Sequence, residues 1–322
     1  MKAIVVYAPG NAEKLLIEER SIPQPKMGEV LIKVRAFGLN RSELMTRKGF
    51  SPNVKFPIIL GIECVGEVEY DPLGVMAKGQ KVLAFMGEMG RQYDGSYAEF
   101  AVLPRTIIYS IESDLPWEIL GAIPEMFQTV YGSLFTALSI QKGETILLRG
   151  GTSSIGLLAG QMANAAGLKV VSTTRNAQKK NFLLENGAAD VLIDNGNLYD
   201  QIQSDYTSGF DKVLELVGTV TLRDSLKCTK LGGIVCMTGM LSEEWSIADF
   251  SPMDFIPAAV HLTIYDSGQI RSSQEVFQKF IESVESGKVR MPIGKIFQLD
   301  QIKEAHRAME ENLVNGKIVV LT

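Results

Sequence analysis

The sequence predicts an α/β protein with two domains, one rich in β-strands and one built on a doubly wound parallel sheet. Up to about residue 115, short β-rich runs are separated by turn residues, whereas after residue 138 near-continuous apolar runs alternate with helical patterns. Strands that are covered by helices on both faces are apolar along their whole length, so the later region indicates a parallel sheet. The 322 residues suffice for two hydrophobic cores.

The first part of the chain shows little helical periodicity. Its strand-like runs are KAIVVYA, EVLIKVRAFG, IECVGEVEY, QKVLAFM, SYAEFAVL and TIIYSI. A helical pattern follows over residues 116–138, with a break at Pro124. After Asp266 the chain returns to mixed patterns and ends on the strand-like run GKIVVLT. We therefore expect residues 1–119 and 266–322 to form one domain.

Residues 120–265 alternate between strands and helices in a regular way. The predicted strands are ETILLRG, LKVVSTT, ADVLIDN, FDKVLELVG, GGIVCMTG and AVHLTIYD. Between them lie the helical patterns IGLLAGQMANAAG, NAQKKNFLLENG and TLRDSLKCTKLG, each ending in a glycine that suits a left-handed helix cap. This order predicts a doubly wound sheet of the Rossmann type.

Composition and charge narrow the classes of function. A net charge of -5 and a pI near 5.3 argue against nucleic acid as a partner, because phosphate backbones need a basic face. No apolar run approaches the roughly 18 residues of a membrane helix, and the first residues lack the pattern of a signal peptide. We therefore expect a cytoplasmic protein without membrane contact. Cys64, Cys228 and Cys236 are not spaced as a paired motif, and His261 and His306 cannot by themselves build a His-rich zinc site.

A turn rich in glycine and serine, LLRGGTSSIG at residues 147–156, follows the first strand of the middle domain. Read from Gly151 it is Gly-x-Ser-x-x-Gly, with Ser153 where the usual dinucleotide fingerprint has glycine. Free amides and the helix dipole favour a diphosphate at such a helix start. Leu157 excludes a Walker loop and Ile155 excludes a nucleophile elbow. A tight turn without a ligand is the alternative. The expected cofactor contacts are Gly151, Thr152, Ser153, Ser154, Ile155 and Gly156.

The strand after this turn indicates which nicotinamide cofactor binds. An acidic residue about 20 positions beyond the turn would hold the ribose hydroxyl of NAD, but no Asp or Glu occurs from Lys169 through Leu184. Hydroxyl and cationic side chains suit a 2′-phosphate instead. They are Ser172, Thr173, Thr174, Arg175, Lys179 and Lys180. We therefore expect NADP(H), with Lys180 equally well explained as part of a solvated helix face.

Several stretches together resemble the medium-chain dehydrogenase/reductases and, within them, the zinc-free quinone oxidoreductases. The resemblance covers nearly the whole chain. Its marks are AFGLNRSELMTRKG, PIILGIECVGEV, PEMFQTVYGSLF, GGTSSIG, GFDKVLELVG, LGGIVCMTG and AHRAMEENLVNGKIVV. The resemblance implies a GroES-like first domain, a homodimer joined through the cofactor domain, and hydride transfer from NADPH to a quinone or an α,β-unsaturated carbonyl.

The resemblance also bears on metal binding. Zinc-dependent relatives carry a cysteine where this chain has Asn40, a histidine where it has Ile62, and a further ligand near Glu125; their four-cysteine lobe is missing here. Zinc needs at least three well-placed ligands. We therefore expect no metal, and an alcohol dehydrogenase is disfavoured.

Further site residues are implied by the resemblance. Asn40 and Thr129 are expected at the nicotinamide end of the cleft, Thr129 near the carboxamide, while Thr238, Gly239 and Met240 are expected to pass beside the cofactor. Alternatively, Asn40 merely caps the helix predicted at residues 41–49.

No residue is evident as the proton donor. Many relatives have a tyrosine in the region of Met45, and methionine cannot donate a proton. Without zinc, hydrogen-bond donors must polarise the acceptor, and Asn40, Arg47 and Gln128 are the candidates, with solvent completing the protonation. We therefore favour electron-poor acceptors. An NADPH-binding regulatory or structural protein with little turnover is the alternative from another class.

Overall fold

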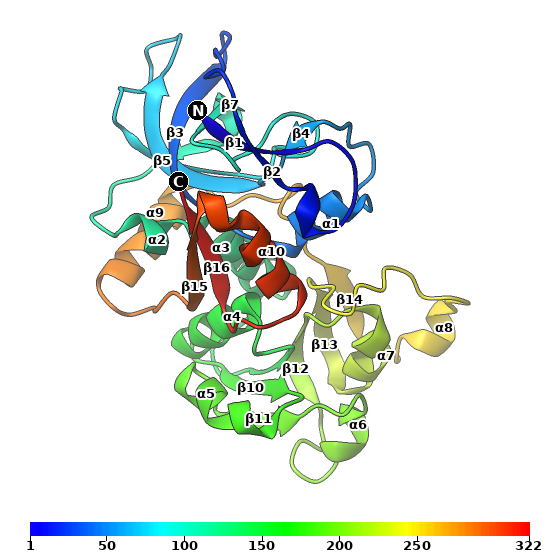
Figure 1. Cartoon of the computed structure of the whole chain (residues 1–322). Helices are drawn as coiled ribbons and strands as arrows, with labels where there is room; N and C mark the ends of the chain where they lie inside the picture. The colour runs from blue at the N-terminus through cyan, green and yellow to red at the C-terminus, as the bar shows by residue number, and fades with distance from the viewer. The chain divides into compact units, whose positions relative to one another are not determined.

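The computed structural model describes all 322 residues and divides into two compact units. Unit 1 consists of Met1–Phe127 with Ser272–Thr322, and unit 2 consists of Gln128–Arg271. The boundaries expected from the sequence, 119/120 and 265/266, lie slightly before these positions. In Figure 1 unit 1 runs from blue to green and again from orange to red, while unit 2 runs from green to yellow.

Unit 1 contains two sheets. The larger has the order β15-β16-β3-β5-β6-β8, and β7 also pairs with β3; the smaller has the order β2-β1-β4. The strands of the larger sheet are β3 (Glu29–Gly38), β5 (Glu63–Tyr70), β6 (Lys81–Phe85), β7 (Phe100–Pro104), β8 (Ile108–Ser110), β15 (Ile293–Gln298) and β16 (Lys317–Leu321). Because β16 pairs antiparallel with β3, the end of the chain completes the sheet begun by its first part.

The smaller sheet contains two strands that the sequence did not predict. β1 (Lys2–Val6) is buried and was expected, but β2 (Leu16–Glu19) and β4 (Ile58–Ile59) were missed. β2 is a mostly exposed edge strand without apolar alternation, and β4 has only 2 residues. Such elements depend on pairing with a neighbour rather than on a pattern of their own.

Short helices complete unit 1. They are α1 (Arg41–Lys48), α2 (Trp117–Leu120), α9 (Gln274–Glu285) and α10 (Ile302–Glu310). α10 buries Ile302, Ala305 and Ala308 on one face, against a core formed by the apolar residues of the strands. α3 (Pro124–Tyr131) begins at the predicted break and contains the boundary between the two units.

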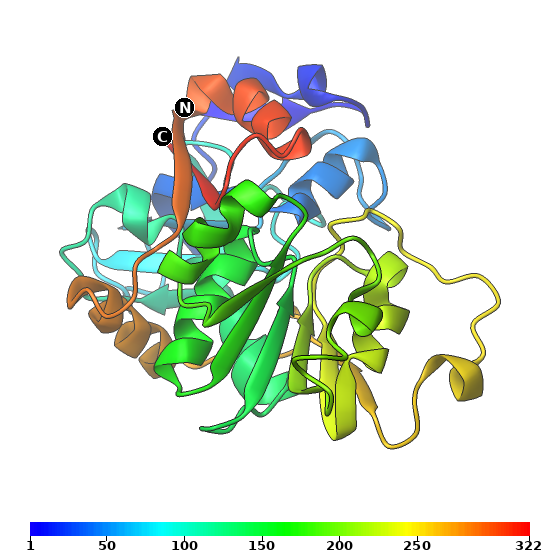
Figure 2. The same cartoon turned by 90° about the horizontal axis from the view of Figure 1, so that it is seen from below.

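Unit 2 is a six-stranded parallel sheet in the order β11-β10-β9-β12-β13-β14. This is the order of a doubly wound dinucleotide-binding fold, so the predicted fold class is confirmed. Figure 2 shows these strands side by side, from green to yellow. They are β9 (Thr145–Arg149), β10 (Lys169–Thr174), β11 (Asp190–Ile193), β12 (Phe210–Glu215), β13 (Thr229–Met237) and β14 (His261–Ile264).

The helices of unit 2 follow the strands. They are α4 (Ser154–Ala165), α5 (Lys180–Glu185), α6 (Leu198–Gln201), α7 (Thr219–Lys227) and α8 (Pro252–Phe255), together with a π-helical segment at Gly132–Ala137. Every strand except the edge strand β14 is thus followed in sequence by a helix or a loop that returns to the amino edge of the sheet. The carboxyl edge is therefore left for ligands, as in other sheets of this type.

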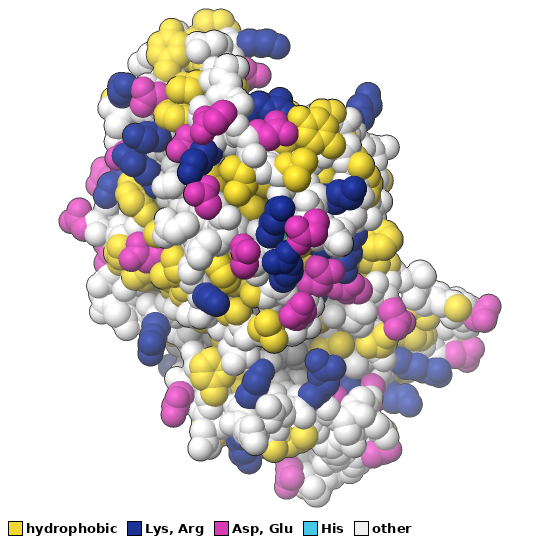
Figure 3. All heavy atoms as spheres, viewed as in Figure 1, with side chains coloured by type: hydrophobic (Ala, Val, Ile, Leu, Met, Phe, Trp, Pro, Cys, Tyr) yellow, Lys and Arg dark blue, Asp and Glu magenta, His cyan; other side chains and the backbone are white.

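The surface and the helix lengths add two observations. On the face shown in Figure 3, basic and acidic side chains are interspersed rather than gathered by sign. That face therefore offers no continuous basic stripe of the kind that nucleic acids require. None of the helices combines the length and the apolar character needed to span a bilayer.

Candidate functional site

The turn between β9 and α4 has open backbone donors. Ser153 is the N-cap of α4: its Oγ accepts a hydrogen bond from the Gly156 N–H at 3.0 Å and donates to the Gly150 carbonyl at 2.9 Å. The backbone N–H groups of Thr152, Ser154 and Ile155 donate to no acceptor in the protein. The turn can therefore take an anion through its backbone. The Ser153 hydroxyl has already used its proton, so it serves the helix rather than a phosphate.

The glycines of this turn are required by close packing. A Cβ on Gly156 would lie 2.7 Å from the carbonyl oxygen of Gly150, and a Cβ on Gly151 would lie 1.9 Å from Ser172 Oγ. Gly150 has a φ of +91°, which side chains rarely adopt. Three glycines in seven residues thus bring strand, turn and helix together and leave the backbone accessible.

The side chains expected to bind a 2′-phosphate differ in availability. Ser172, Thr173 and Thr174 are at most 5% exposed. Thr173 Oγ1 accepts from the Gly150 N–H at 3.0 Å, and Thr174 Oγ1 accepts from the Asn176 N–H at 3.1 Å. The expectation that these hydroxyls reach the phosphate is corrected, because all three are buried and those of Thr173 and Thr174 hold the turns instead.

The cations after β10 are better placed for a phosphate. Arg175 directly follows the strand and is exposed, and its guanidinium makes no ion pair. Lys179 is half-buried, and Lys180 is exposed at the start of α5. Of the predicted group, Arg175 is therefore the exposed cation that lies directly at the end of β10.

Thr238, Gly239 and Met240, three of the residues expected beside the nicotinamide, follow β13 at the carboxyl edge of the sheet. Thr238 follows β13, and its Oγ1 lies 2.9 Å from Ser133 Oγ, in the π-helical segment. Gly239 packs so tightly that a Cβ would lie 2.4 Å from the Leu216 carbonyl oxygen. Met240 is half-buried, and so is Thr129 in α3. π-Helical turns are frequent at functional sites, and this one brings Ser133 to the end of β13.

One buried arginine at this edge was missed from the sequence. Arg149, the last residue of β9, is fully buried and forms a bidentate pair with Asp194, with distances of 2.9 and 3.0 Å. It also donates to Asp224 at 2.6 Å. The available signal was a lone charge at the end of an apolar strand. Through these bonds Arg149 joins the end of β9 to Asp194, which follows β11, and to Asp224 in α7, beside the open turn.

In unit 1, Asn40 belongs to a closed ring of polar contacts. Its Nδ2 donates to Glu63 Oε1 at 2.8 Å, and its Oδ1 accepts from Lys317 Nζ at 2.6 Å. Lys317 Nζ in turn lies 2.7 Å from Glu63 Oε1. Glu63 and Lys317 are almost fully buried, whereas Asn40 is half-buried. The sequence identified Asn40 but gave no indication of its two charged partners.

A second carboxyl group lies against this ring. Glu43 accepts from the Asn40 N–H at 3.1 Å and from the Ile62 N–H at 3.2 Å, in the manner of a capping residue. Burial raises the pKa of Glu43 to about 7; nearby Glu63 raises it further and Lys317 opposes the shift. Two carboxyl groups thus share one buried cation, and Glu43 carries a proton for part of the time near neutral pH.

The residues at the expected zinc positions do not fit that metal. Asn40 offers an amide that is already bonded to Lys317 and Glu63, and Ile62 is an apolar side chain with 3% exposure. Glu125 offers its backbone N–H to Glu63 Oε2 at 2.7 Å. No group of three or more His, Cys, Asp or Glu side chains is arranged to hold a metal ion. The cation beside Glu63 is the ammonium of Lys317.

Arg47 is not available to a substrate, which corrects one prediction. Its side chain is fully buried and donates to the Gly10 carbonyl at 3.1 Å and to Glu310 Oε2 at 2.7 Å. Its Nη1 lies 3.2 Å from His306 Nδ1. Burial lowers the pKa of His306 to about 3, and Arg47 lowers it too. His306 is therefore neutral and accepts at Nδ1, while its Nε2 faces the Tyr97 hydroxyl at 3.1 Å.

Gln128 is corrected for the same reason. It is fully buried, and its Nε2 donates to the Tyr265 hydroxyl and to the Ile270 carbonyl, the latter at 3.1 Å. Both of its N–H groups thus serve the interior of unit 2. Of the three predicted donors, Asn40 alone has a partly exposed side chain.

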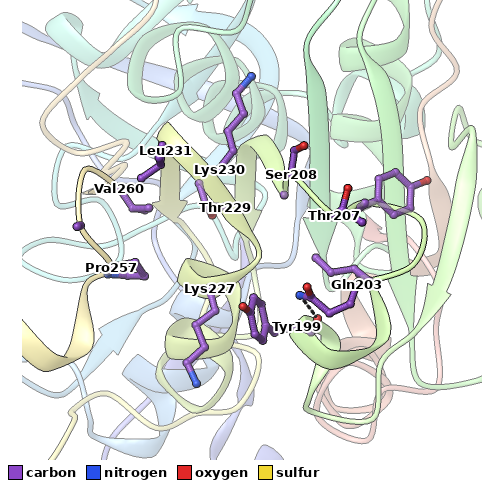
Figure 4. Close-up of a pocket in the computed structure, with 14 residues that line it drawn as sticks. Tyr199, Gln203, Thr207, Ser208, Lys227, Thr229, Lys230, Leu231, Pro257 and Val260 are labelled. Atoms are coloured by element: carbon purple, nitrogen blue, oxygen red, sulfur yellow. Dashed lines mark hydrogen bonds between the residues drawn. The ribbon is translucent and has the colours of Figure 1, made fainter.

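A pocket of about 220 Å³ lies at the opposite edge of the sheet of unit 2 (Figure 4). Its lining includes residues just before or at the start of the strands, among them Ser208, Thr229 and Val260. Because the strands are parallel, this edge is the one away from the turn after β9. The pocket is therefore separate from the candidate cofactor site.

Two family models match this chain. One, described as a zinc-binding dehydrogenase, matches residues 154–286, and the other, an alcohol dehydrogenase GroES-like domain, matches residues 26–113. Among curated relatives, a quinone oxidoreductase from Mus musculus is 29% identical over 98% of this chain and 95% of its own length. An acryloyl-coenzyme A reductase from Sulfurisphaera tokodaii is 26% identical over 99% of both chains.

Solved structures show the same fold over the whole chain. A mycobacterial protein in complex with NADPH has a TM-score of 0.88 at 25% identity, and the match covers 100% of each chain. A quinone oxidoreductase from Pseudomonas syringae has a TM-score of 0.89 at 22% identity, covering 100% of this chain and 99% of its own. Taken with the two family models, these relatives establish that the chain belongs to the medium-chain dehydrogenase/reductase superfamily and is an oxidoreductase of the quinone oxidoreductase-like type.

Proposed function

We propose that the chain transfers hydride from NADPH to a quinone or a related electron-poor α,β-unsaturated carbonyl, without zinc. The observation that carries the proposal is the donor set of unit 1. The expected zinc positions hold an amide, an isoleucine and a glutamate, and the only partly exposed donor among the predicted residues is the neutral amide of Asn40. A single neutral donor gives limited polarisation, so the acceptor must already be electron-poor.

The relatives support this class of acceptor. Quinone oxidoreductases reduce an acceptor of high electron affinity, and an acryloyl-coenzyme A reductase acts on a conjugated thioester. The acceptors in both names, a quinone and acryloyl-coenzyme A, are conjugated carbonyl compounds. In either case the hydride is followed by a proton, and we propose that solvent supplies it beside the half-buried Asn40.

NADPH is the proposed cofactor because its phosphates match the donors of unit 2. When bound, the reduced nicotinamide supplies the hydride. The free N–H groups of Thr152, Ser154 and Ile155 would hold the diphosphate, and the exposed Arg175 would pair with the 2′-phosphate. The complex of the mycobacterial neighbour with NADPH supports this choice.

We further propose that two chains associate through unit 2. β14 is an edge strand with one side unpaired, and Ile264 on it is 59% exposed. Met253 and Trp245, in the segment before β14, are 92% and 64% exposed. An open strand edge and exposed apolar residues each favour association with another chain. Light scattering is expected to give the mass of a dimer, and a monomer at micromolar concentration would contradict this proposal.

A screen of NADPH and NADH oxidation tests the proposed reaction. The acceptors are a simple quinone, an aromatic enone and a 2-alkenal, each measured with and without a chelator. We expect the highest kcat/KM with NADPH and the quinone, unchanged by chelation. Tight binding of NADPH without oxidation by any acceptor would favour a regulatory protein instead, and activity that disappears with the chelator would favour a metal enzyme.

A further inference from the structure

Lys317, Glu63 and Asn40 come from three separate segments and close a ring of short contacts. Lys317 is the first residue of β16, Glu63 is the first residue of β5, and Asn40 caps α1. The three distances are 2.6, 2.7 and 2.8 Å. Burying an ammonium is costly unless its charge is paired and hydrogen-bonded, and here one carboxylate and one amide oxygen do both.

This ring fixes which way the Asn40 amide points. The oxygen and nitrogen ends of an amide have almost the same shape, so hydrogen-bond partners determine the orientation. Lys317 can only donate, and the Glu63 carboxylate can only accept. The amide oxygen must therefore face Lys317, and the Nδ2 must face Glu63, as the distances of 2.6 and 2.8 Å show.

One of the two Nδ2 protons of Asn40 is left weakly used. The first goes to Glu63 at 2.8 Å, whereas the remaining acceptors are distant, with Glu43 Oε1 at 3.3 Å and the Gly38 carbonyl at 3.5 Å. Hydrogen bonds of this length are weak. Because the Asn40 oxygen accepts from a cation, its N–H groups are polarised into better donors.

The surroundings prevent Lys317 from leaving this position. A Cβ on Gly38 would lie 2.2 Å from Lys317 Cε and 2.5 Å from Glu63 Oε1, so the lysine stem runs directly along the Gly38 backbone. The second oxygen of Glu63 is held by the Glu125 N–H at 2.7 Å. Lys317 itself is 2% exposed. The cation is thus part of the packed interior.

We propose that Lys317 is a positioning residue for the reaction: its ammonium keeps the Asn40 amide in the orientation that offers an N–H to the oxygen of the acceptor. This inference rests on the proposed function. Lys317 touches neither acceptor nor cofactor in this account and acts through Asn40. Glu63 fixes the other end of the amide by accepting from the Asn40 Nδ2.

A double-mutant cycle tests this role. The variants are Lys317→Met, Asn40→Ala and the two combined, with Lys295→Met as the control because Lys295 is an exposed lysine on the neighbouring strand β15. We expect Lys317→Met to lower kcat for the quinone by about 10-fold or more, with the Kd of NADPH changed less than about 2-fold. In the Asn40→Ala background the same substitution should change kcat by less than about 2-fold. Lys295→Met should leave all values unchanged.

Two conservative variants keep the test valid if Lys317→Met does not fold. Lys317→Arg retains the cation and Lys317→Gln removes it, so kcat should fall in the order wild type, arginine, glutamine. Equal kcat values, or effects of Lys317→Met that multiply with those of Asn40→Ala, would overturn the inference while the wild type remains active. If the wild type itself fails to oxidise NADPH with any acceptor, the proposed function fails instead.

Discussion

The turn after β9 and the cluster around Asn40 treat their polar groups in opposite ways. The turn leaves the N–H groups of Thr152, Ser154 and Ile155 without acceptors, whereas the cluster pairs a buried cation with Glu63 and an amide. Unit 2 thus offers backbone donors to a ligand. Unit 1 uses its charges internally, to fix the position of one neutral side chain. Binding and chemistry are accordingly expected to respond differently to substitution, which the following predictions examine.

The largest effect is expected from Arg47→Met, which removes a fully buried cation. Glu310 and His306 would lose a partner, and breaking a buried ion pair typically costs about 3–5 kcal/mol. Chemical denaturation should show that loss, while kcat/KM of the folded variant stays within about 3-fold of wild type, because Arg47 does not face a substrate. The control is Arg307→Met, whose side chain on α10 is 44% exposed. If the variant is as stable as wild type but has a much lower kcat, Arg47 donates a hydrogen bond to the substrate after all.

The next effect concerns the pH dependence of stability. The pKa of Glu43 is about 7 in the folded protein and 4.5 ordinarily, so the folded state binds more protons between these values and this group loses its contribution as the pH rises through 7. At about 1.4 kcal/mol per pKa unit, the contribution is about 3 kcal/mol. Glu43→Gln cannot titrate. The free energy of unfolding of the wild type, relative to that of this variant, should therefore decrease from pH 5 to pH 8. A difference that stays constant with pH would contradict the raised pKa of Glu43.

The open turn should be sensitive to a single side chain. Gly156→Val places its Cβ within 2.7 Å of backbone atoms of Gly150 and Gly151, so the turn must open and its amides lose their common direction. We expect the Kd of NADPH to rise by about 100-fold, equivalent to about 2.7 kcal/mol. Asn164→Ala, at an exposed position of the same helix, is the control. Unaltered affinity in a titration of cofactor fluorescence would show that the diphosphate binds elsewhere.

The smallest effect is expected from Ser153→Ala. The hydroxyl caps α4 and has no proton left for a ligand, so its loss should lower stability by about 1 kcal/mol. The Kd of NADPH should change by less than about 3-fold, because the free backbone donors remain. Thermal unfolding and titration of the same samples separate the two outcomes. A large loss of affinity at unchanged stability would indicate a direct bond from Ser153 to phosphate.

The features that could be predicted from the sequence depend on neighbouring residues, whereas those that could not depend on residues far apart in the sequence. Alternating strands and helices, and the turn after β9, are encoded in contiguous residues, so the fold class and the location of the turn were predicted. The partners of Arg149 and Lys317 lie 45 and 254 residues away in sequence. Patterns within a segment could not show that these cations are buried.

The same reason explains the corrected site residues. Arg47 and Gln128 appeared as free donors because their acceptors, Glu310 and the Ile270 carbonyl, are 263 and 142 residues away. Ser172 to Thr174 were expected at a ligand because their hydroxyls end a strand, but Thr173 bonds to Gly150 across to the neighbouring strand. The sequence shows which side chains can donate hydrogen bonds, but it does not show which of them are already bonded to other residues in the interior.

The most direct test of the proposed reaction is a single-turnover measurement on protein stripped of metal. NADPH is first bound to a slight excess of protein, and a quinone is then added while the absorbance of the cofactor is followed. Complete oxidation of the bound NADPH, at the same rate before and after addition of zinc, is the predicted result. NADPH that remains reduced, or that is oxidised only after zinc is restored, would contradict it.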